Sequence, residues 1–176
     1  RHSIQRNDQS PVPLFSVVGG KLTTCRSLAE EAAGIVLRAI HRPVQCTSAD
    51  RTLPGGENYP ASDDQVQSAK LQLAQRFEVE PKHVSAMWRL VGNQTGAILE
   101  QMLAEDADAS ARQPVVGTPF PEAFVRWMIR HEWVQTLDDL ICRRLMLIAQ
   151  RKLSLATLEQ LAKLLVEEGK LQSADQ

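Results

Sequence analysis

Two adjacent glycines followed by a lysine form the segment of this 176-residue chain whose chemistry is easiest to interpret. Gly19 and Gly20 stand between a short apolar run and a helical pattern, and Lys21 follows directly. The first N–H groups of a helix have no partners inside the helix, and the helix dipole places partial positive charge there. Glycines carry no Cβ that would keep a planar ligand or a phosphate away from the backbone. With the charge of Lys21 and the hydroxyls of Thr23 and Thr24, the segment predicts a site for an anion or a polar carbonyl group.

The glycine pair also has a simpler interpretation, a tight connection between a strand and a helix. The pattern is neither a GxGxxG fingerprint nor a P-loop, so both interpretations stay open at this point. Cys25 lies one turn into the same helix, where the dipole can lower the pKa of a thiol. A small buried residue is the simpler interpretation of this cysteine.

The other residues that could take part in chemistry are either far apart in the sequence or form pairs of opposite charge. The four histidines lie outside metal-ligand spacing of each other and of the cysteines, which argues against a zinc site; they are His2, His41, His83 and His131. His131 stands beside Glu132, but a helical histidine of this kind is usually a packed or surface residue. Arg143 and Arg144 follow Asp138-Asp139 by four to five residues. This spacing predicts exposed ion pairs worth about a few tenths of a kcal/mol.

The composition excludes several classes of protein. Lys and Arg total 20 against 21 Asp and Glu, so a net charge of −1 creates no overall attraction to nucleic acid. No apolar run approaches the roughly 18 residues of a membrane helix. The three cysteines are widely spaced, which favours reduced thiols in the cytoplasm. The chain opens at Arg1 without a methionine or a signal peptide, so we expect a piece of a longer protein.

Two short strands are predicted before the glycines, over residues 2–6 and 14–18. Two strands alone are marginal in water, so this hairpin must pack on something else. A helix is predicted from Lys21 to about residue 40, and residues 42–62, with three prolines and two glycines, read as a linker loop.

Beyond the linker the apolar periodicity is helical throughout. Helices are expected over about 63–77, 81–91, 95–105, 122–134, 137–148 and 154–168. Trp133 and Ile148 fall on the apolar faces of their helices, and Thr136 with Asp139 predicts a capping box. The predicted fold class is therefore mainly α. A C-terminal helical bundle over residues 63–170, with a tail at 171–176, follows a short β-hairpin and helix.

Several strings together resemble one known family. The string LFSVVGGKLTT at 14–24, followed by Arg26, resembles the last FAD-domain strand and helix of the FAD-dependent (aerobic, quinone-linked) glycerol-3-phosphate dehydrogenases. LPGG at 53–56 resembles a loop of that family. The spacing of Glu122, HEWV at 131–134, the Asp pair and the Arg pair resembles its C-terminal helical domain. The similarity runs from about residue 2 to about residue 147.

The resemblance implies an enzyme that oxidises sn-glycerol 3-phosphate to dihydroxyacetone phosphate. FAD would take the hydride and pass electrons to a quinone, or to oxygen in the oxidase branch. Family positions matching Gly19, Gly20, Lys21, Leu22 and Thr23 hold the flavin and its ribityl chain with their backbone, and Lys21 also matches a substrate-facing lysine. The residues agree with this role, because a helix N-terminus at the flavin N1–C2=O edge would stabilise the reduced, anionic flavin. Residues 1–41 would then be the end of an FAD-binding domain.

The sequence departs from the family pattern at a few positions. The family commonly has Tyr at Cys25 and Thr at Leu145. It also has a phosphate-binding arginine in an S-R-x-H-x-[IV] segment. If His2 is the histidine of that segment, the arginine lies one residue before the chain. If the strand is shifted by one residue, Arg1 is the phosphate-binding residue, and we prefer the first register.

Two hypotheses about function follow. In the first, the chain is a C-terminal portion that alone neither retains FAD nor turns over substrate. Glycerol 3-phosphate and a quinone are then partners of the full-length enzyme, with a homodimer and a peripheral membrane association left open. In the second, the chain is a free-standing helical interaction module without a ligand. The first expects Phe15 and Val17 to be exposed because their sheet is missing, and the second expects them to be covered.

Overall fold

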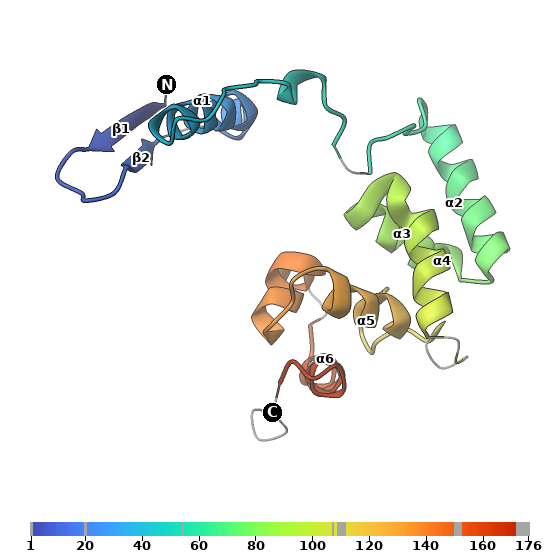
Figure 1. Cartoon of the computed structure of the whole chain (residues 1–176). Helices are drawn as coiled ribbons and strands as arrows, with labels where there is room; N and C mark the ends of the chain where they lie inside the picture. Colours follow the sequence, from blue (N-terminus) through green and yellow to red (C-terminus); the bar gives the residue numbers. More distant parts are fainter. Residues whose placement is uncertain are drawn as a thin grey trace. The chain divides into compact units, whose positions relative to one another are not determined.

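A computed structural model describes residues 2–19, 21–53, 55–106, 108, 112–149 and 153–171 of the chain. Its residues divide into two compact units, Arg1–Thr52 and Leu53–Gln176, which are coloured blue to teal and green to red in Figure 1. Arg1 and Gly20, two of the predicted site residues, lie outside the described residues.

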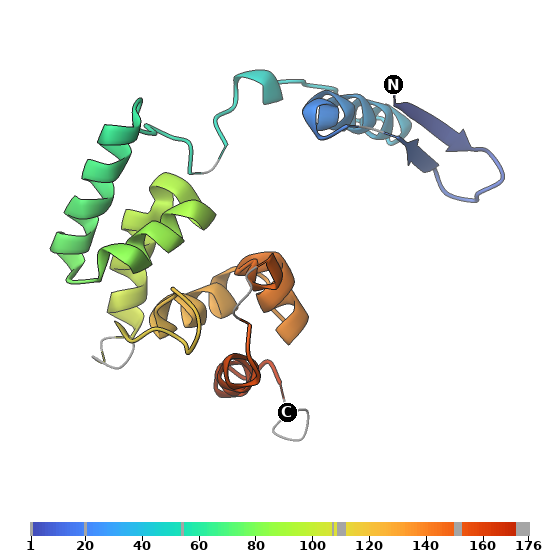
Figure 2. The ribbon, with the colours of Figure 1, turned by 180° about the vertical axis from the view of Figure 1, so that it is seen from behind.

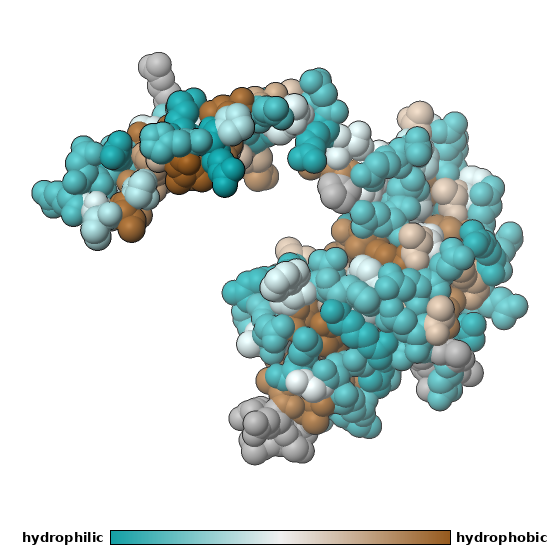
Figure 3. Space-filling view, viewed as in Figure 1, coloured by the Kyte–Doolittle hydropathy of each residue, from teal (hydrophilic) through white to brown (hydrophobic). Residues whose placement is uncertain are grey.

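The first unit consists of a hairpin and one long helix. Strands β1 (Ser3–Asn7) and β2 (Leu14–Val18) pair antiparallel. A 3-10 turn, η1 (Leu22–Thr24), then leads into helix α1 (Cys25–Ala39). Gly34 is the only buried residue in the described part of this unit. The hairpin and the helix therefore enclose no core of their own, and Figure 3 shows apolar side chains on the surface of this unit.

The second unit is helical and has a continuous core. Its helices are α2 (Asp63–Phe77), α3 (Pro81–Val91), α4 (Thr95–Glu105), α5 (Glu122–His131), the π-helix η5 (Asp139–Arg144) and α6 (Leu155–Glu167), with short 3-10 turns η3 (Gly92–Gln94) and η6 (Leu147–Ala149). Helix α4 contacts α2, α3 and α5 (Figures 1 and 2). The largest fully buried core side chains include Met87, Leu99, Met102, Phe124, Leu140 and Leu161. The prediction of a mainly α fold is confirmed.

Capping residues set the ends of several helices where the sequence predicts them. Ser62 caps α2 by accepting a hydrogen bond from the N–H of Gln65. Pro81 occupies the first turn of α3, where its missing N–H costs nothing. Ser154 caps α6, and Gly169, at φ 69°, follows its last turn.

Two positions that were predicted to be inward-facing are exposed. Helix α5 ends at His131 rather than near residue 134, and Trp133 is 87% exposed at φ 55°. Ile148 is likewise exposed, because a left-handed residue at Met146 ends the helical course after η5. Both errors have one cause, since the apolar period continues in the sequence beyond the point where the backbone leaves the helix.

The predicted linker loop contains a tight backbone contact at the start of the helical unit. The carbonyl of Gly55 accepts a hydrogen bond from the N–H of Asn93 at 3.0 Å, and Asn93 Nδ2 donates to the carbonyl of Glu57 at 2.8 Å. Both Gly55 and Gly92 have positive φ. A Cβ on Gly55 would lie 2.6 Å from the carbonyl oxygen of Val91. We call this contact the glycine latch.

Candidate functional site

The glycine–lysine entrance is a turn between β2 and α1. Gly19 has φ 79°, a conformation that a residue with a Cβ rarely adopts. Lys21 is extended and caps η1, with its carbonyl accepting from the N–H and the hydroxyl of Thr24 at 2.9 and 3.0 Å. The α-helix starts only at Cys25, so a 3-10 turn supplies the first N–H groups rather than α1 itself.

The entrance is open to solvent. Leu22 is 89% exposed, and Lys21 and Thr23 are exposed as well. The described residues of the unit therefore leave this turn uncovered, and a flat ligand can approach its backbone.

Ionic contacts attach neighbouring segments to α1. His2 Nε2 lies 2.8 Å from Glu31 Oε2, which joins the start of the hairpin to the helix. On α1, Glu30 accepts hydrogen bonds from the N–H and the hydroxyl of Ser48 at 3.2 and 2.5 Å and pairs with Arg26 at 3.0 Å. The hydroxyl of Ser48, and then Arg26, lower the pKa of the Glu30 carboxyl below its usual value.

The segment after α1 forms one wall of a groove on this helix. The groove has a volume of about 280 Å³ and is lined by Ala29, Ala33 and Leu37 of α1 and by Val44, Cys46 and Thr47 of the following segment. Glu30 and Ser48 also line this groove, so their contacts lie in its wall. They fix how the segment crosses the helix that starts at the entrance.

Cys25, where the sequence departs from the family pattern, lies in an environment that differs from the expected one. Cys25 is exposed, so the simpler interpretation of a small buried residue is wrong. The first turn of α1 buries nothing against this position, because the unit has no core. Leu145, at the second departure, is buried in the helical unit.

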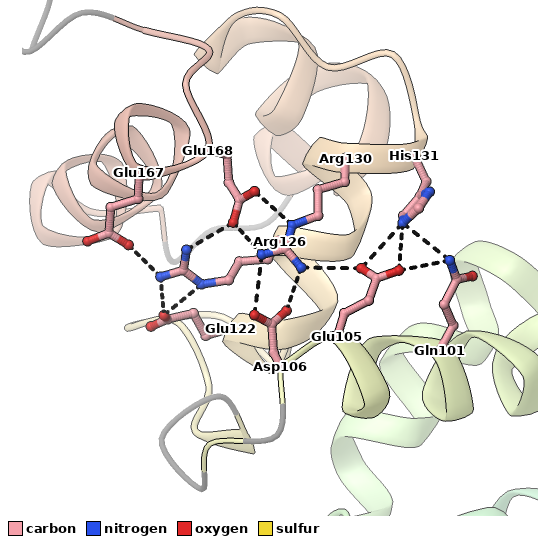
Figure 4. A network of polar contacts seen from close by, with 9 residues as sticks. All are labelled: Gln101, Glu105, Asp106, Glu122, Arg126, Arg130, His131, Glu167 and Glu168. Carbon is pink, nitrogen blue, oxygen red and sulfur yellow. Dashed lines mark hydrogen bonds and ion pairs between the residues drawn. The ribbon is translucent and has the colours of Figure 1, made fainter.

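His131 belongs to a polar network in the helical unit. Figure 4 shows Arg126 and Arg130 at the centre of five carboxylates, from Glu105, Asp106, Glu122, Glu167 and Glu168. His131 Nε2 lies 3.0 Å from Glu105 Oε1, and its ring packs on Trp127 at 5.2 Å. The expectation of a packed or surface histidine agrees with this position.

The network shifts the titration of its members. Hydrogen bonds from Arg130 and Arg126 lower the pKa of the Glu168 carboxyl, although its partial burial acts in the opposite direction. The Glu168 carboxylate in turn raises the pKa of Arg130. The network therefore joins the ends of α4 and α6 to α5. The network is not among the features predicted from the sequence, although Glu122, Arg126 and Arg130 stand at four-residue spacing on one helix face.

The Asp pair and the Arg pair behave in two different ways. Arg143 Nη1 contacts Asp139 at 2.7 Å and Asp138 at 2.5 Å, as the spacing predicts. Arg144 makes no such pair among the described residues. Its Nε instead donates to the carbonyl of Glu132, beyond the end of α5.

The amino-acid sequence of the chain matches one family over most of its length. A family described as the C-terminal domain of alpha-glycerophosphate oxidase matches residues 46–176. This is more than half of the chain. The chain belongs to this family.

The matches between this chain and several relatives are longer than the second unit, so they reach into the first unit. The aerobic glycerol-3-phosphate dehydrogenase of Escherichia coli (strain K12) is 30% identical over 138 residues, which cover 78% of this chain and 26% of the relative. A glycerol-3-phosphate dehydrogenase of Pseudomonas aeruginosa is 32% identical over 133 residues, covering 75% and 24%. The D-erythritol 1-phosphate dehydrogenase of Brucella abortus is 30% identical over 133 residues, covering 75% and 25%. This chain thus spans about a quarter of the length of these curated relatives.

The described residues contain no group of three His, Cys, Asp or Glu side chains placed to hold a metal ion. None of their helices combines the length and the apolar character needed to cross a bilayer.

Proposed function

We propose that the chain forms the C-terminal part of a flavoprotein that oxidises sn-glycerol 3-phosphate to dihydroxyacetone phosphate and passes the electrons to a quinone. The observation that carries this proposal is the open turn at Gly19 and Lys21–Thr23, attached to a unit without a core, in a chain whose relatives are dehydrogenases of phosphorylated polyols. Residues 1–41 would belong to the FAD-binding domain and residues 63–170 to the helical domain.

The residues of the entrance suit a flavin. Gly19 at φ 79° has no side chain, and Lys21, Leu22 and Thr23 are exposed, so the N1–C2=O edge of a flavin would have access to the turn. When bound, FAD supplies the hydride acceptor. The partial positive charge of the helix entrance and the ammonium of Lys21 would stabilise negative charge on the reduced ring.

Lys21 has a second role in this proposal. The relatives act on phosphorylated polyols, although the polyols differ. A lysine attracts a phosphate as a point charge without demanding one geometry. We assign Lys21 to the phosphate end of the substrate, with the arginine of the S-R-x-H-x-[IV] segment as its companion, in the preferred register just before Arg1.

The exposure of the hairpin supports this proposal over a free-standing helical module. Val17 is 48% exposed, as this hypothesis expects, and Leu14 and Val18 are also exposed, whereas the expected exposure of Phe15 is not found, since it is half-buried. An antiparallel pair with open edges and apolar faces needs further strands or helices to become stable. We therefore propose that the chain alone neither retains FAD nor turns over substrate. A homodimer and a peripheral association with the inner face of the cell membrane belong to the same proposal.

The test has two parts. The purified chain should be colourless and inactive with glycerol 3-phosphate and added FAD. Residues 1–176 are then fused to the Escherichia coli relative in place of the part that they match, and reduction of a quinone analogue is measured. Flavin absorbance together with turnover, and a raised KM for glycerol 3-phosphate in Lys21→Met but not in Lys163→Met, is the expected result. A flavin-loaded fusion that does not oxidise the substrate contradicts the proposal.

A further inference from the structure

The turn after α5 displays a tryptophan in a costly backbone conformation. Trp133 is 87% exposed and has φ 55°. A bulky residue rarely adopts positive φ, and here it does so directly after the C-cap of α5. Tryptophan is also the side chain most enriched among residues that dominate binding energy at protein interfaces.

The turn is held from both sides, so Trp133 is presented rather than loose. Before it, the carbonyl of Glu132 accepts a hydrogen bond from Arg144 Nε at 2.5 Å. After it, Asp139 Oδ2 accepts from the N–H groups of Gln135 and Thr136 at 3.2 and 3.1 Å. The Thr136 hydroxyl accepts from the N–H of Asp139 at 3.1 Å, which completes the predicted capping box.

A groove of about 280 Å³ runs beside this turn, between the end of α3 and η5. Leu90, Val91 and Met128 form its apolar wall, and Glu132, Arg143 and Arg144 belong to its polar wall. A second hollow shares Leu90 and continues along Arg89, Leu145 and Met146. The two hollows together have one apolar side and three arginines.

The arginines of this groove keep unused donors. Both contacts of Arg143 with aspartates use Nη1, so its Nη2 is free of them. Arg144 is half-buried, and within the described part of the chain it has no carboxylate partner. Charged groups that are withdrawn from water are usually paired. The sequence from Arg143 to Leu158 also has four basic and no acidic residues, in a chain of net charge −1.

We propose that this groove docks an acidic peptide segment. Its carboxylates would take the free donors of Arg143 and Arg144, since guanidinium binds carboxylate through two parallel hydrogen bonds. An apolar side chain of the segment would rest on the wall of Leu90 and Met128, and Trp133 would cover it. A flat anionic lipid surface fits less well, because Arg143 and Arg144 line a groove, which the side chains of a peptide can enter and a flat surface cannot. This inference does not depend on the flavin assignment.

The probe is a short synthetic peptide rich in glutamate and leucine, titrated into the full chain by calorimetry at low salt. The same peptide with glutamine for glutamate is the control. Binding should weaken with added salt and be absent for the glutamine peptide. Trp133→Gly and Arg144→Gln should each reduce affinity by about tenfold or more, while Arg76→Gln, at an exposed arginine on α2, should not.

Several results would overturn the proposal. The first is no binding of the glutamate peptide at low salt. The second is an affinity of Trp133→Gly and Arg144→Gln for this peptide equal to that of the natural chain. The third is tighter binding to vesicles of phosphatidylglycerol than to the peptide, abolished by the same variants. Glycine accepts the φ of residue 133 without strain, so the Trp133→Gly variant keeps the turn. Thermal melts of both variants confirm that the helical unit is folded in each titration.

Discussion

The glycine latch makes a quantitative prediction about what joins the LPGG loop to the helices. Gly55→Ala places a Cβ 2.6 Å from the carbonyl oxygen of Val91, and Gly92→Ala places one 2.7 Å from the carbonyl oxygen of Gly55. Both contacts are with backbone, which cannot rotate away as a side chain can. The chain must separate, and the hydrogen bond from Asn93 to Gly55 is then lost.

Gly169 provides a matched control for this prediction. It also has positive φ, at 69°, but a Cβ there meets nothing within 4 Å. Gly169→Ala should therefore show the conformational cost alone, about 1–2 kcal/mol. Gly55→Ala adds a buried hydrogen bond that is broken, about 1–3 kcal/mol. The free energy of unfolding should thus fall by about 2–5 kcal/mol in the latch variant, out of a typical total of about 5–15 kcal/mol.

Urea denaturation of the full chain measures both values. Trp88 Nε1 donates to the Tyr59 hydroxyl at 2.7 Å beside the latch, so tryptophan fluorescence reports on the region. If Gly55→Ala costs no more than Gly169→Ala, the close backbone approach contributes nothing and the reasoning is refuted.

Three further predictions concern the helical unit. Arg130→Met should lower the free energy of unfolding by about 1–2 kcal/mol, after allowance for partial exposure, whereas Lys163→Met on α6 should change it by less than about 0.5 kcal/mol. Urea denaturation measures both changes, and equal effects would argue against a stabilising role of the network. The pKa values of Glu105 and Glu168 are lowered in the folded state, so their stabilisation is present above their usual pKa of 4.5 and is lost as the pH falls below it. Acid titration of stability should show this loss, and it should be smaller in Arg130→Met. Trp133→Gly should melt no lower than the natural chain, because relief of about 1–2 kcal/mol at positive φ offsets the added chain entropy of about 0.5–1 kcal/mol; a clear loss of Tm would show that Trp133 packs on the unit.

Local signals account for most of the helix boundaries that the sequence predicts. Ser62, Pro81 and Ser154 act within one turn of their own position, through a cap or a missing N–H. Such signals are written in consecutive residues, so one sequence suffices to interpret them. The error at Trp133 is of another kind, because Arg144, twelve residues further on, holds the carbonyl before it.

The features of the candidate site are likewise of two kinds: those that local residue types predict and those that depend on contacts between distant segments. The open turn at Gly19 and Lys21 follows from residue types and from the resemblance. The contacts of Glu30 with Ser48, and the latch between Gly55 and Gly92, join segments that are 18 and 37 residues apart. No periodicity encodes such pairs, so the linker loop at 42–62 was predicted without either of them.

The network on α5 has an uneven number of positive and negative members. Its two guanidinium groups are surrounded by five carboxylates. Loss of any one acid leaves each cation with another acceptor, whereas loss of either cation leaves several acids facing one another. Single substitutions should therefore be tolerated at the acidic positions and be harmful at Arg126 and Arg130. The redundancy of this network protects it against the loss of one negative charge but not against the loss of one positive charge.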